Sequence, residues 1–427
     1  MQKAKVTICG LAWGILLGAT PVNANYLQGL GTLANAPVRF TEATAISADG
    51  SVVVGKTVQA DGSEFGSEIA YWWKNGVGMH SLGEIPQDLK TFNATAVSGD
   101  GTIVAGISVT GDVFLARVDV NGMVTDGNSV TGMRFAGAIS ADGKTIVGAS
   151  GSFPTTAETR IIRNLDAANP LTAVPIVVEE LNDQNELVNV NVQGVATATN
   201  SDGSVIVGYR GSEAFRIENN TEVTIEKDST DQGLGPVGVS DDGLIVAGTR
   251  STSEFLSMPF VWKKGELNIR ELSTGAYTQV VARGLSGDGK TILGEGRDAF
   301  SRKRALLWLD DDGDGNYAGP GEVLFTGTNT SGNFQIQTVA GLSADGKFAA
   351  GWGTESGARV AFRIVFDATI WARYLAHSDG VNVDTGDFLG WINISSPPWV
   401  YVYSLDNYVY LPEEFVQDSG AWVWIGP

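Results

Sequence analysis

The chain has 427 residues, of which 43% are hydrophobic and 55 are glycine, and its formal net charge at pH 7 is −20. This composition is sufficient to fill a core and is rich enough in glycine for many turns. The acidic balance argues against nucleic acid and anionic membranes as partners, because phosphates need clustered lysine and arginine.

The first 24 residues predict a cleaved secretory signal peptide. Lys3 and Lys5 form its positive start, Val6–Ala19 its apolar stretch and Val22–Ala24 its small-residue cleavage site. A membrane anchor is the less favoured alternative, because the apolar stretch is shorter than the ~20 residues of a spanning helix. Cleavage removes two lysines, no acidic residue and the only cysteine, Cys9, which moves the charge from −20 to −22. We therefore expect an exported protein, secreted, periplasmic or at the cell surface, with neither a transmembrane segment nor a disulfide.

One line of sequence occurs seven times. It consists of a small and an apolar residue, Ser-x-Asp-Gly (with Asn for Ser once), and an apolar run that closes on a glycine six residues after the aspartate. The repeats are numbered here by their aspartates, which are Asp49, Asp100, Asp142, Asp202, Asp242, Asp288 and Asp345. A constant motif with spacers of variable length predicts one supersecondary unit per repeat.

Ser-x-Asp-Gly has the composition of a type I turn that ends on a glycine in the left-handed region. Apolar runs flank it, so each motif predicts a hairpin of two antiparallel strands. A second hairpin follows, for example at Ala70–Gly76 and Pro259–Gly265. Four short strands per repeat, arranged radially, predict an all-β fold: a seven-bladed β-propeller of four-stranded antiparallel blades over residues 25–366.

The ring is expected to close through the start of the mature chain. Tyr26–Leu33 precedes the first motif and resembles a fourth strand, whereas the last repeat ends near Phe366 without one. We therefore predict that residues 26–33 pair with the strand around Val360–Val365, because an open ring would expose a sheet edge.

Residues 26–366 resemble the bacterial extracellular repeats called HAF, on the signature Ser-x-Asp-Gly-x-x-[Ile/Val]-[Val/Ala]-Gly. The His-Ala-Phe tripeptide of that family is reduced to Ala214-Phe215 and Ala361-Phe362. A similar Ser-Pro-Asp-Gly line is found in propellers of the TolB type. Both resemblances imply a propeller scaffold, and neither implies a catalytic residue.

Residues 367–427 predict a separate module. Asp367 is a helix cap by type, and Ile370, Trp371, Tyr374 and Leu375 share one helical face, so a short helix is expected up to Gly380. Phe388–Pro427 alternates aromatic and polar residues and resembles the Trp-rich β-meanders that end other bacterial secreted proteins. Its aromatic residues pack a small sheet, attach the protein to a cell surface, or stack on sugars.

The clearest candidate site is a calcium loop that begins at Asp310. Asp310, Asp312 and Asp314 take positions 1, 3 and 5, Gly315 takes position 6, and Asn316 offers its carbonyl at position 7. The closing acid, Glu322, lies one residue late. A bound structural calcium and a solvated acidic hairpin tip are the two interpretations.

Other chemistry has little support in the sequence. Gly284–Thr291 matches the phosphate-loop pattern, but a strand and not a helix is predicted to follow, so no nucleotide site is expected. His80 and His377 have no metal-binding spacing. We expect a non-enzymatic binding or surface protein that recognises a protein or a glycan. The alternatives are a propeller glycosidase or lyase with its acids in the long spacers, near residues 151–195 and 297–338, and a purely structural envelope protein.

Overall fold

The computed structural model describes residues 22–33, 38–59, 67–85, 89–151, 157–165, 172–181, 187–227, 231–252, 254, 256–310, 313–325, 327–328, 333–371, 374–375, 382–384, 391–396, 399–403, 407–410 and 424–425. The chain forms two compact units, residues 25–366 and residues 1–24 with 367–427. The described residues of both units contain strands and no helix.

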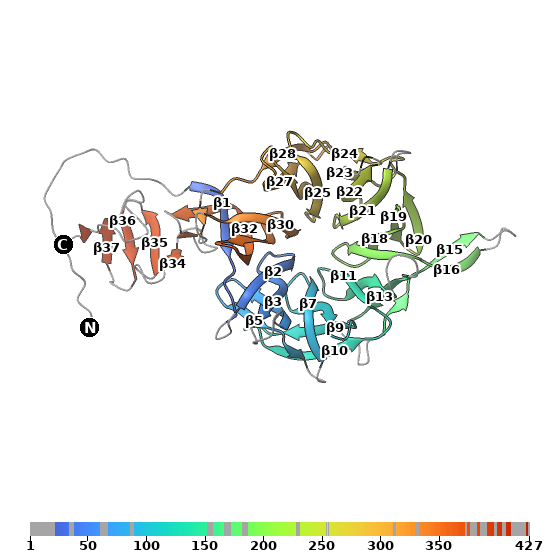
Figure 1. Cartoon of the computed structure of the whole chain (residues 1–427), viewed down its shortest axis with the longest axis horizontal. Coiled ribbons are helices and arrows are strands. Elements are labelled where there is room, and N and C mark those ends of the chain that lie inside the picture. The colour runs from blue at the N-terminus through green and yellow to red at the C-terminus, as the bar shows by residue number, and fades with distance from the viewer. Residues whose placement is uncertain are drawn as a thin grey trace. The chain divides into compact units, whose positions relative to one another are not determined.

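In the first unit, strands that follow one another along the chain pair as antiparallel sheets. The first six repeats contain β2 (Val38–Ile46), β3 (Val52–Gln59), β4 (Ser67–Lys74) and β5 (Gly78–Ser81); β6 (Glu84–Ile85), β7 (Leu89–Val97), β8 (Ile103–Ser108), β9 (Val113–Val118) and β10 (Val124–Val130); β11 (Phe135–Ile139), β12 (Thr145–Ala149), β13 (Thr159–Arg163) and β14 (Val174–Pro175); β17 (Val195–Thr199), β18 (Val205–Arg210), β19 (Glu213–Glu218) and β20 (Thr221–Ile225); β21 (Asp231–Val239), β22 (Ile245–Thr252), β23 (Ser257–Lys263) and β24 (Arg270–Glu271); and β25 (Thr278–Leu285), β26 (Thr291–Arg297), β27 (Lys303–Leu309) and β28 (Ala318–Glu322). Figure 1 shows these sheets arranged around a central axis, which makes this unit a β-propeller.

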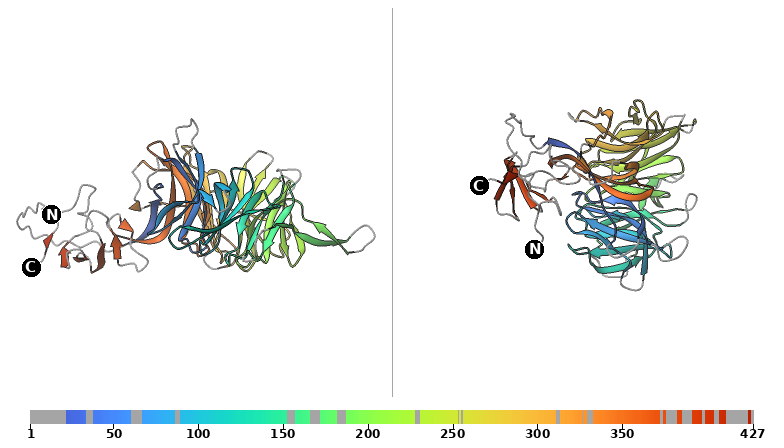
Figure 2. Two further views of the ribbon diagram at one scale, coloured as in Figure 1. Left: turned by 90° about the horizontal axis from the view of Figure 1, so that it is seen from below. Right: turned by 60° about the vertical axis from the view of Figure 1, so that its left-hand side comes forward.

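A separate hairpin follows the third repeat. It consists of β15 (Val177–Leu181) and β16 (Leu187–Asn191) and projects from the ring of sheets (Figures 1 and 2). Val178 and Val192 at its base are buried together with Phe215 of the fourth repeat.

The Ser-x-Asp-Gly motifs are the predicted turns between the first two strands of each repeat. In the first repeat, Asp49 Oδ1 accepts hydrogen bonds from Ser47 Oγ at 2.5 Å and from the Ser51 backbone N at 2.9 Å. The following glycine is in the left-handed region in every repeat, with φ between 68° at Gly50 and 75° at Gly101. These contacts confirm the predicted turn and account for its aspartate, its serine and its glycine.

The turns also bind one another in a closed ring. Each link is a hydrogen bond between neighbouring turns: Asp49 N to Gly99 O, Gly99 N to Ala141 O, Asp142 N to Ser201 O, Asn200 Nδ2 to Asp241 O, Asp241 N to Gly287 O, Gly287 N to Ala344 O, and Ala344 N to Ala48 O. Because the last link returns to the first turn, the seven motifs surround one axis. We call this end of the inner strands the turn face and the other end the connection face, where the β8–β9 and β26–β27 connections lie.

A β-bulge lies in every inner strand, five residues before the motif aspartate. It leaves Thr44, for example, without a register partner between Ala43 and Ala45. The bulge brings the backbone of this strand close to the glycine that closes the motif. A Cβ added at Gly55 would lie 2.0 Å from Glu42 O, so the close approach requires glycine at that position.

The predicted closure is confirmed. The seventh repeat contains β30 (Gln335–Leu342), β31 (Phe348–Glu355) and β32 (Ala358–Trp371), and β1 (Val22–Gly29) is the neighbour of β32. Leu30 N donates to Ala361 O at 3.0 Å, and β1 also pairs in parallel with β29 (Gly327–Thr328). The strand β1 therefore covers an edge of the sheet of the seventh repeat.

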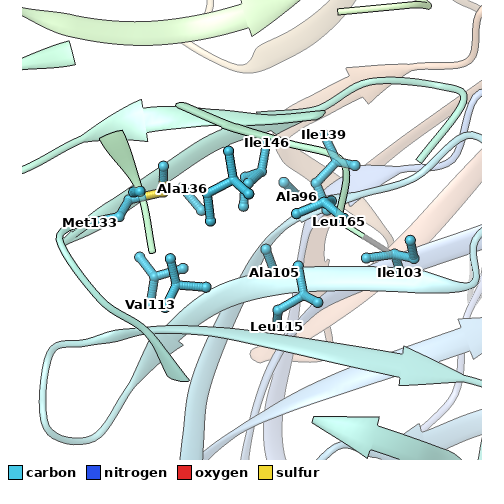
Figure 3. Packing of buried hydrophobic residues seen from close by; sticks show 13 residues of the cluster. Ala96, Ile103, Ala105, Val113, Leu115, Met133, Ala136, Ile139, Ile146 and Leu165 are labelled. Carbon is cyan, nitrogen blue, oxygen red and sulfur yellow. The ribbon is translucent and has the colours of Figure 1, made fainter. Parts of the chain in front are cut away.

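The core lies between adjacent sheets, as expected for strands that are apolar on both faces. Figure 3 shows the cluster between the second and third repeats, in which Leu115 and Ile146 are buried together with Met133. Arginine side chains on the third strand also form hydrogen bonds between repeats, which were not predicted from the sequence. Arg216 donates to Gly243 O from Nε at 3.0 Å and Nη2 at 2.9 Å, and Arg363 Nη1 donates to Gly50 O at 2.9 Å. Each bond ties one repeat to the turn of the next.

In the second unit, the helix expected after Asp367 is not confirmed. Residues 367–371 extend β32, and Tyr374–Leu375 form β33, which pairs with Ile370 and Trp371. The helical spacing of these residues coexists with β-branched and aromatic side chains that suit a strand, and pairing with the existing strand prevails over the local pattern.

The aromatic meander is present as β34 (Asn382–Asp384), β35 (Trp391–Ser396), β36 (Trp399–Val402), β37 (Asn407–Tyr410) and β38 (Trp424–Ile425). Its buried described side chains are aliphatic: Ile392, Ile394, Val400, Val402 and Val409. Tyr401 contacts Tyr403 and Tyr408 edge to face, at centroid distances of 5.3 and 5.1 Å. Tyr403 and Tyr408 are each 52% exposed, so these two tyrosines do not form the core of the sheet.

Candidate functional site

The repeated aspartates lie on the turn face, and their carboxylates bind their own turns. In repeats two and six, for example, Oδ1 of Asp100 and Asp288 accepts from the serine two residues earlier, at 2.7 and 2.6 Å. The pKa of Asp100 is lowered, because hydrogen bonds from Ser98 and Thr102 outweigh the desolvation that would raise it. These carboxylates hold the turns in shape.

A channel runs along the axis between the inner strands. It has a volume of about 310 Å³ and is lined by residues of all seven repeats, mostly alanine, glycine, threonine, valine, isoleucine and leucine. Among the described residues that line it, Arg283 is the one charged side chain. It occupies the bulge position of the sixth repeat, where the other repeats have Thr44, Thr95, Gly137, Thr197, Val237 and Ala340.

Arg283 is held by a buried carboxylate. Its Nη2 donates to Glu295 Oε1 at 2.9 Å, and Lys303 Nζ binds the same oxygen at 3.2 Å. Glu295 Oε2 accepts from Val339 N of the seventh repeat at 2.9 Å. Burial would raise the pKa of Glu295, but the Arg283 charge and hydrogen bond, with Thr338 and Lys303, lower it. Glu295 is therefore an ionised anchor that positions two cations and joins two repeats.

These cations face a pocket of about 260 Å³ beside the inner strand of the sixth repeat. Its lining residues are Ser257, Gln279, Val281, Arg283, Glu295, Gly296, Arg297 and Lys303. Arg297 Nε donates to Gln279 Oε1 at 2.8 Å, and its Nη1 donates to Ser301 O at 2.8 Å. Gln279 has φ of 50°, a left-handed conformation that is uncommon for a residue other than glycine.

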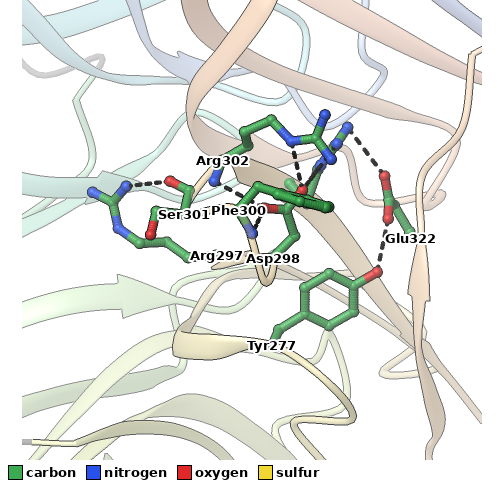
Figure 4. A network of polar contacts seen from close by, with 8 residues as sticks. Tyr277, Arg297, Asp298, Phe300, Ser301, Arg302 and Glu322 are labelled. Carbon is green, nitrogen blue, oxygen red and sulfur yellow. Dashed lines mark hydrogen bonds and ion pairs between the residues drawn. The ribbon is translucent and has the colours of Figure 1, made fainter.

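The connection between β26 and β27 forms a compact turn next to this pocket (Figure 4). Asp298 Oδ1 accepts from the backbone N of Phe300 and of Arg302, both at 2.9 Å. Its Oδ2 accepts from Arg302 Nε at 2.8 Å and from Arg304 Nε at 3.0 Å. Desolvation would raise the pKa of Asp298, but these hydrogen bonds lower it to about 2. The carboxylate therefore stays ionised and fixes the turn.

The turn displays an aromatic ring and a cation to solvent. Phe300 is 79% exposed, and the Arg302 guanidinium lies over its ring at 4.9 Å from the centroid. The Arg302 side chain is itself 55% exposed. Exposed aromatic and arginine side chains on a fixed backbone are typical of the residues that dominate protein interfaces.

Tyr277 and Glu322 continue the network (Figure 4), and Arg304 connects them to Asp298. Tyr277 OH donates to Glu322 Oε2 at 2.8 Å, and Arg304 Nη1 lies 3.3 Å from Glu322 Oε1. Burial and the Glu322 carboxylate raise the pKa of the Tyr277 phenol, so the phenol stays protonated at neutral pH.

The structure places Glu322, a predicted calcium ligand, in this network and not with the loop aspartates. Asp310 is buried, and its two oxygens accept from Gly313 N and Gly315 N, each at 2.9 Å. Asp314 Oδ1 accepts from Asn316 N at 2.7 Å and its Oδ2 from Asn316 Nδ2 at 2.8 Å. Asp312 lies outside the described residues. Among the residues that are described, no group of three or more acidic, histidine or cysteine side chains is placed to hold a metal ion.

A basic side chain also contacts this loop. Arg270 Nη1 donates to Gly315 O at 2.7 Å, so a guanidinium already lies beside the loop. The described carboxylates accept hydrogen bonds from backbone amides or from Asn316, or pair with Arg304. The role of Asp312 in binding calcium stays a prediction.

A melting experiment tests this loop directly. The calcium interpretation predicts that the mature chain melts at a higher temperature in millimolar calcium than in a chelator, whereas the hairpin-tip interpretation predicts the same melting temperature in both. A ligand at about 100 times its dissociation constant would add about 2.7 kcal/mol to the free energy of unfolding. A calcium-dependent rise in melting temperature that Asp312→Ala abolishes would instead establish the metal site.

The Arg283 pocket was not predicted above, although the sequence carries a signal for it. Aligning the seven motifs places arginine at the bulge in one repeat alone, and Arg297, Arg302, Lys303 and Arg304 follow within the same repeat. In an acidic chain such a concentration of cations is unusual. The turn at 298–302 also lies at the start of the long spacer in which specificity was expected.

The Gly284–Thr291 segment is a hairpin turn, and β26 begins at Thr291, where a phosphate loop would begin a helix. Within the described part of the chain, no helix is long and apolar enough to cross a membrane.

No protein-family model matches the chain, and neither does any curated protein. Among solved structures, TolB from Acinetobacter baumannii is 13% identical, with a TM-score of 0.40 over 73% of this chain and 66% of that protein. The Dos1 propeller is 11% identical, with a TM-score of 0.42 over 81% and 93%. The β-propeller domain of the Trilobed protease from Pyrococcus furiosus is 8% identical, with a TM-score of 0.49 over 77% and 95%. The chain thus spans just under two thirds of the TolB structure, and its assignment as a propeller rests on its own sheets and ring of turns.

Proposed function

We propose that the chain is an exported, non-enzymatic binding protein, and that its seven repeats form the blades of one propeller. Its partner binds on the connection face of the sixth repeat. The observation that carries this proposal is the turn 298–302, on which Asp298 fixes the backbone while Phe300 and Arg302 remain exposed. A rigid scaffold that presents an aromatic ring and an arginine loses little conformational entropy on binding.

The polar groups of this face support binding better than glycoside hydrolysis. A glycosidase needs a carboxylic acid whose pKa is raised, so that it can donate a proton near neutral pH. The pKa values of Asp298 and Glu295 are both lowered. Arg304 also lies between Asp298 and Glu322 and pairs with both of them. These carboxylates are suited to holding cations in place.

Export and surface attachment are further parts of the proposal. Residues 1–21, which hold most of the predicted signal peptide, lie outside the described residues, so cleavage rests on the sequence pattern. Tyr401, Tyr403 and Tyr408 give residues 367–427 a partly exposed aromatic face, which supports their assignment as an attachment module. The resemblance to HAF repeats agrees with an extracellular location.

Phe300→Ala tests the binding face. We expect the mature wild-type chain to bind members of a peptide or glycan array. Phe300→Ala should lower the affinity for those ligands about 30-fold, as for a hot spot worth about 2 kcal/mol. Val109→Ala is the matched control, because Val109 is 57% exposed on the equivalent connection of the second repeat. If ligands bind Phe300→Ala as tightly as wild type, the binding face lies elsewhere on the protein. Cleavage of an arrayed glycan would show that the protein is an enzyme and not a binding protein.

A further inference from the structure

We propose that the partner at this face is an acidic peptide segment, one carboxylate of which enters the pocket lined by Arg283, Arg297 and Lys303. This inference rests on the proposed function, because it places the peptide on the surface that Phe300 and Arg302 form. It adds the chemical class of the partner and the groups that select it.

The pocket carries an excess of positive charge, which is complementary to a carboxylate. The lining of the pocket contains three cations and one carboxylate, Glu295, in a chain that has 28 basic and 48 acidic residues. Glu295 is 4% exposed, and it already accepts from Arg283, Lys303 and the Val339 backbone. Glu295 thus pairs with two of the three cations, and a second carboxylate brought by a partner would reduce the excess positive charge of the pocket.

Arg297 is held in the pocket by neutral groups. Its guanidinium donates to two neutral acceptors, Gln279 Oε1 and Ser301 O, and it forms no ion pair with any described residue. Its orientation therefore does not depend on an acidic partner within the protein. The uncommon backbone of Gln279, at φ of 50°, places the amide that holds Arg297 at the wall of the pocket. Gln279 lies at a β-bulge, in the register shift between Thr278 and Val281.

The position of Arg297 also joins the pocket to the exposed turn. It lines the pocket, and through Ser301 O it contacts the residue that follows Phe300. An extended peptide can therefore place a carboxylate in the pocket and an apolar side chain against Phe300 at the same time. Recognition of acidic segments by arginine clusters is an established mode of peptide binding.

The inventory of donors and acceptors favours a peptide over a sugar. The pocket presents the guanidinium and ammonium groups of Arg283, Arg297 and Lys303, which are donors without acceptor capacity. Its carboxylate acceptor, Glu295, is already occupied by three donors. Sugar hydroxyls require acceptors as well as donors, whereas a carboxylate only accepts.

The test uses the mature full chain and three fluorescent probes: a nonapeptide of alternating glutamate and glycine, the same peptide with glutamine for glutamate, and an oligogalacturonate. We expect anisotropy to show binding of the glutamate peptide, weakening of that binding as salt is raised, and at least tenfold weaker binding of the glutamine peptide. Arg297→Gln should weaken binding of the glutamate peptide about tenfold, because it removes a charge but can retain a hydrogen bond.

Arg134→Gln is the matched control. The Arg134 side chain is 55% exposed and pairs with Asp112, which lies on the equivalent connection of the second repeat. We expect the Arg134→Gln variant to bind the glutamate peptide like wild type. Lys303→Gln provides a second variant if Arg297→Gln does not fold. Equal binding of both peptides, or tighter binding of the oligogalacturonate, would overturn the acidic-peptide inference. If neither acidic probe binds but array ligands still depend on Phe300, this inference fails while the proposed function stands. If those ligands do not depend on Phe300, the proposed function itself fails.

Discussion

Replacing Leu27 by alanine should lower the free energy of unfolding of the propeller by about 2–5 kcal/mol, the range for truncation of a buried leucine. Leu27 lies near the start of the chain, yet it is 3% exposed within a cluster that includes Leu293 and Val323 of the sixth repeat and Phe362 of the seventh. Its side chain therefore joins two repeats that lie far from it in sequence. The cavity left by alanine would weaken the region where the ring closes.

Urea denaturation of the mature chain measures this effect. Leu267→Ala is the control, because Leu267 is 82% exposed, and its replacement should change stability by no more than about 0.5 kcal/mol. Leu30→Ala should resemble Leu27→Ala, since Leu30 is buried with Trp73 of the first repeat and Ala361 of the seventh. If Leu27→Ala and Leu267→Ala unfold at the same urea concentration, β1 does not hold the ring closed.

The parts of the fold that could be predicted from the sequence are those governed by local chemistry. A serine, an aspartate and a glycine at fixed spacing determine the turn, because their contacts lie within five residues. The closing strand could also be predicted, since an unpaired edge at one end of the chain matched an unpaired strand at the other.

The candidate site depends on contacts between repeats, which local patterns do not show. The sequence predicts Arg283 only as one residue of an inner strand. The bulge that places it in the channel results from the pairing of β25 with β26, which the sequence pattern does not show. Glu322 was assigned to a calcium loop by its spacing from Asp310, but it pairs with Arg304 and Tyr277 on neighbouring segments. The expected helix after Asp367 depended on helical spacing and on a cap and an end residue chosen by type, and β32 continues through its first residues instead.

Alanine at Gly101 should destabilise the propeller by about 2–5 kcal/mol, which combines about 1–2 for the left-handed backbone with about 1–3 for overpacking. Gly101 has φ of 75°, and a Cβ there would lie 2.3 Å from Val52 Cγ2 in the first repeat. Its carbonyl also accepts a hydrogen bond from Trp72 Nε1 at 2.9 Å, so a shift of the turn would disturb a buried tryptophan. The turn is therefore constrained both by its own backbone and by the repeat before it.

Gly76→Ala separates these two contributions. Gly76 has nearly the same backbone, with φ of 77°, but nothing lies within 4 Å of the position that a Cβ would take. We expect Gly76→Ala to cost only the backbone strain, about 1–2 kcal/mol, so the difference between the two variants in urea denaturation measures the contact between neighbouring repeats. Equal destabilisation by both variants would show that the turn of the second repeat does not pack against Val52, and that the turns act independently instead of supporting one another around the ring.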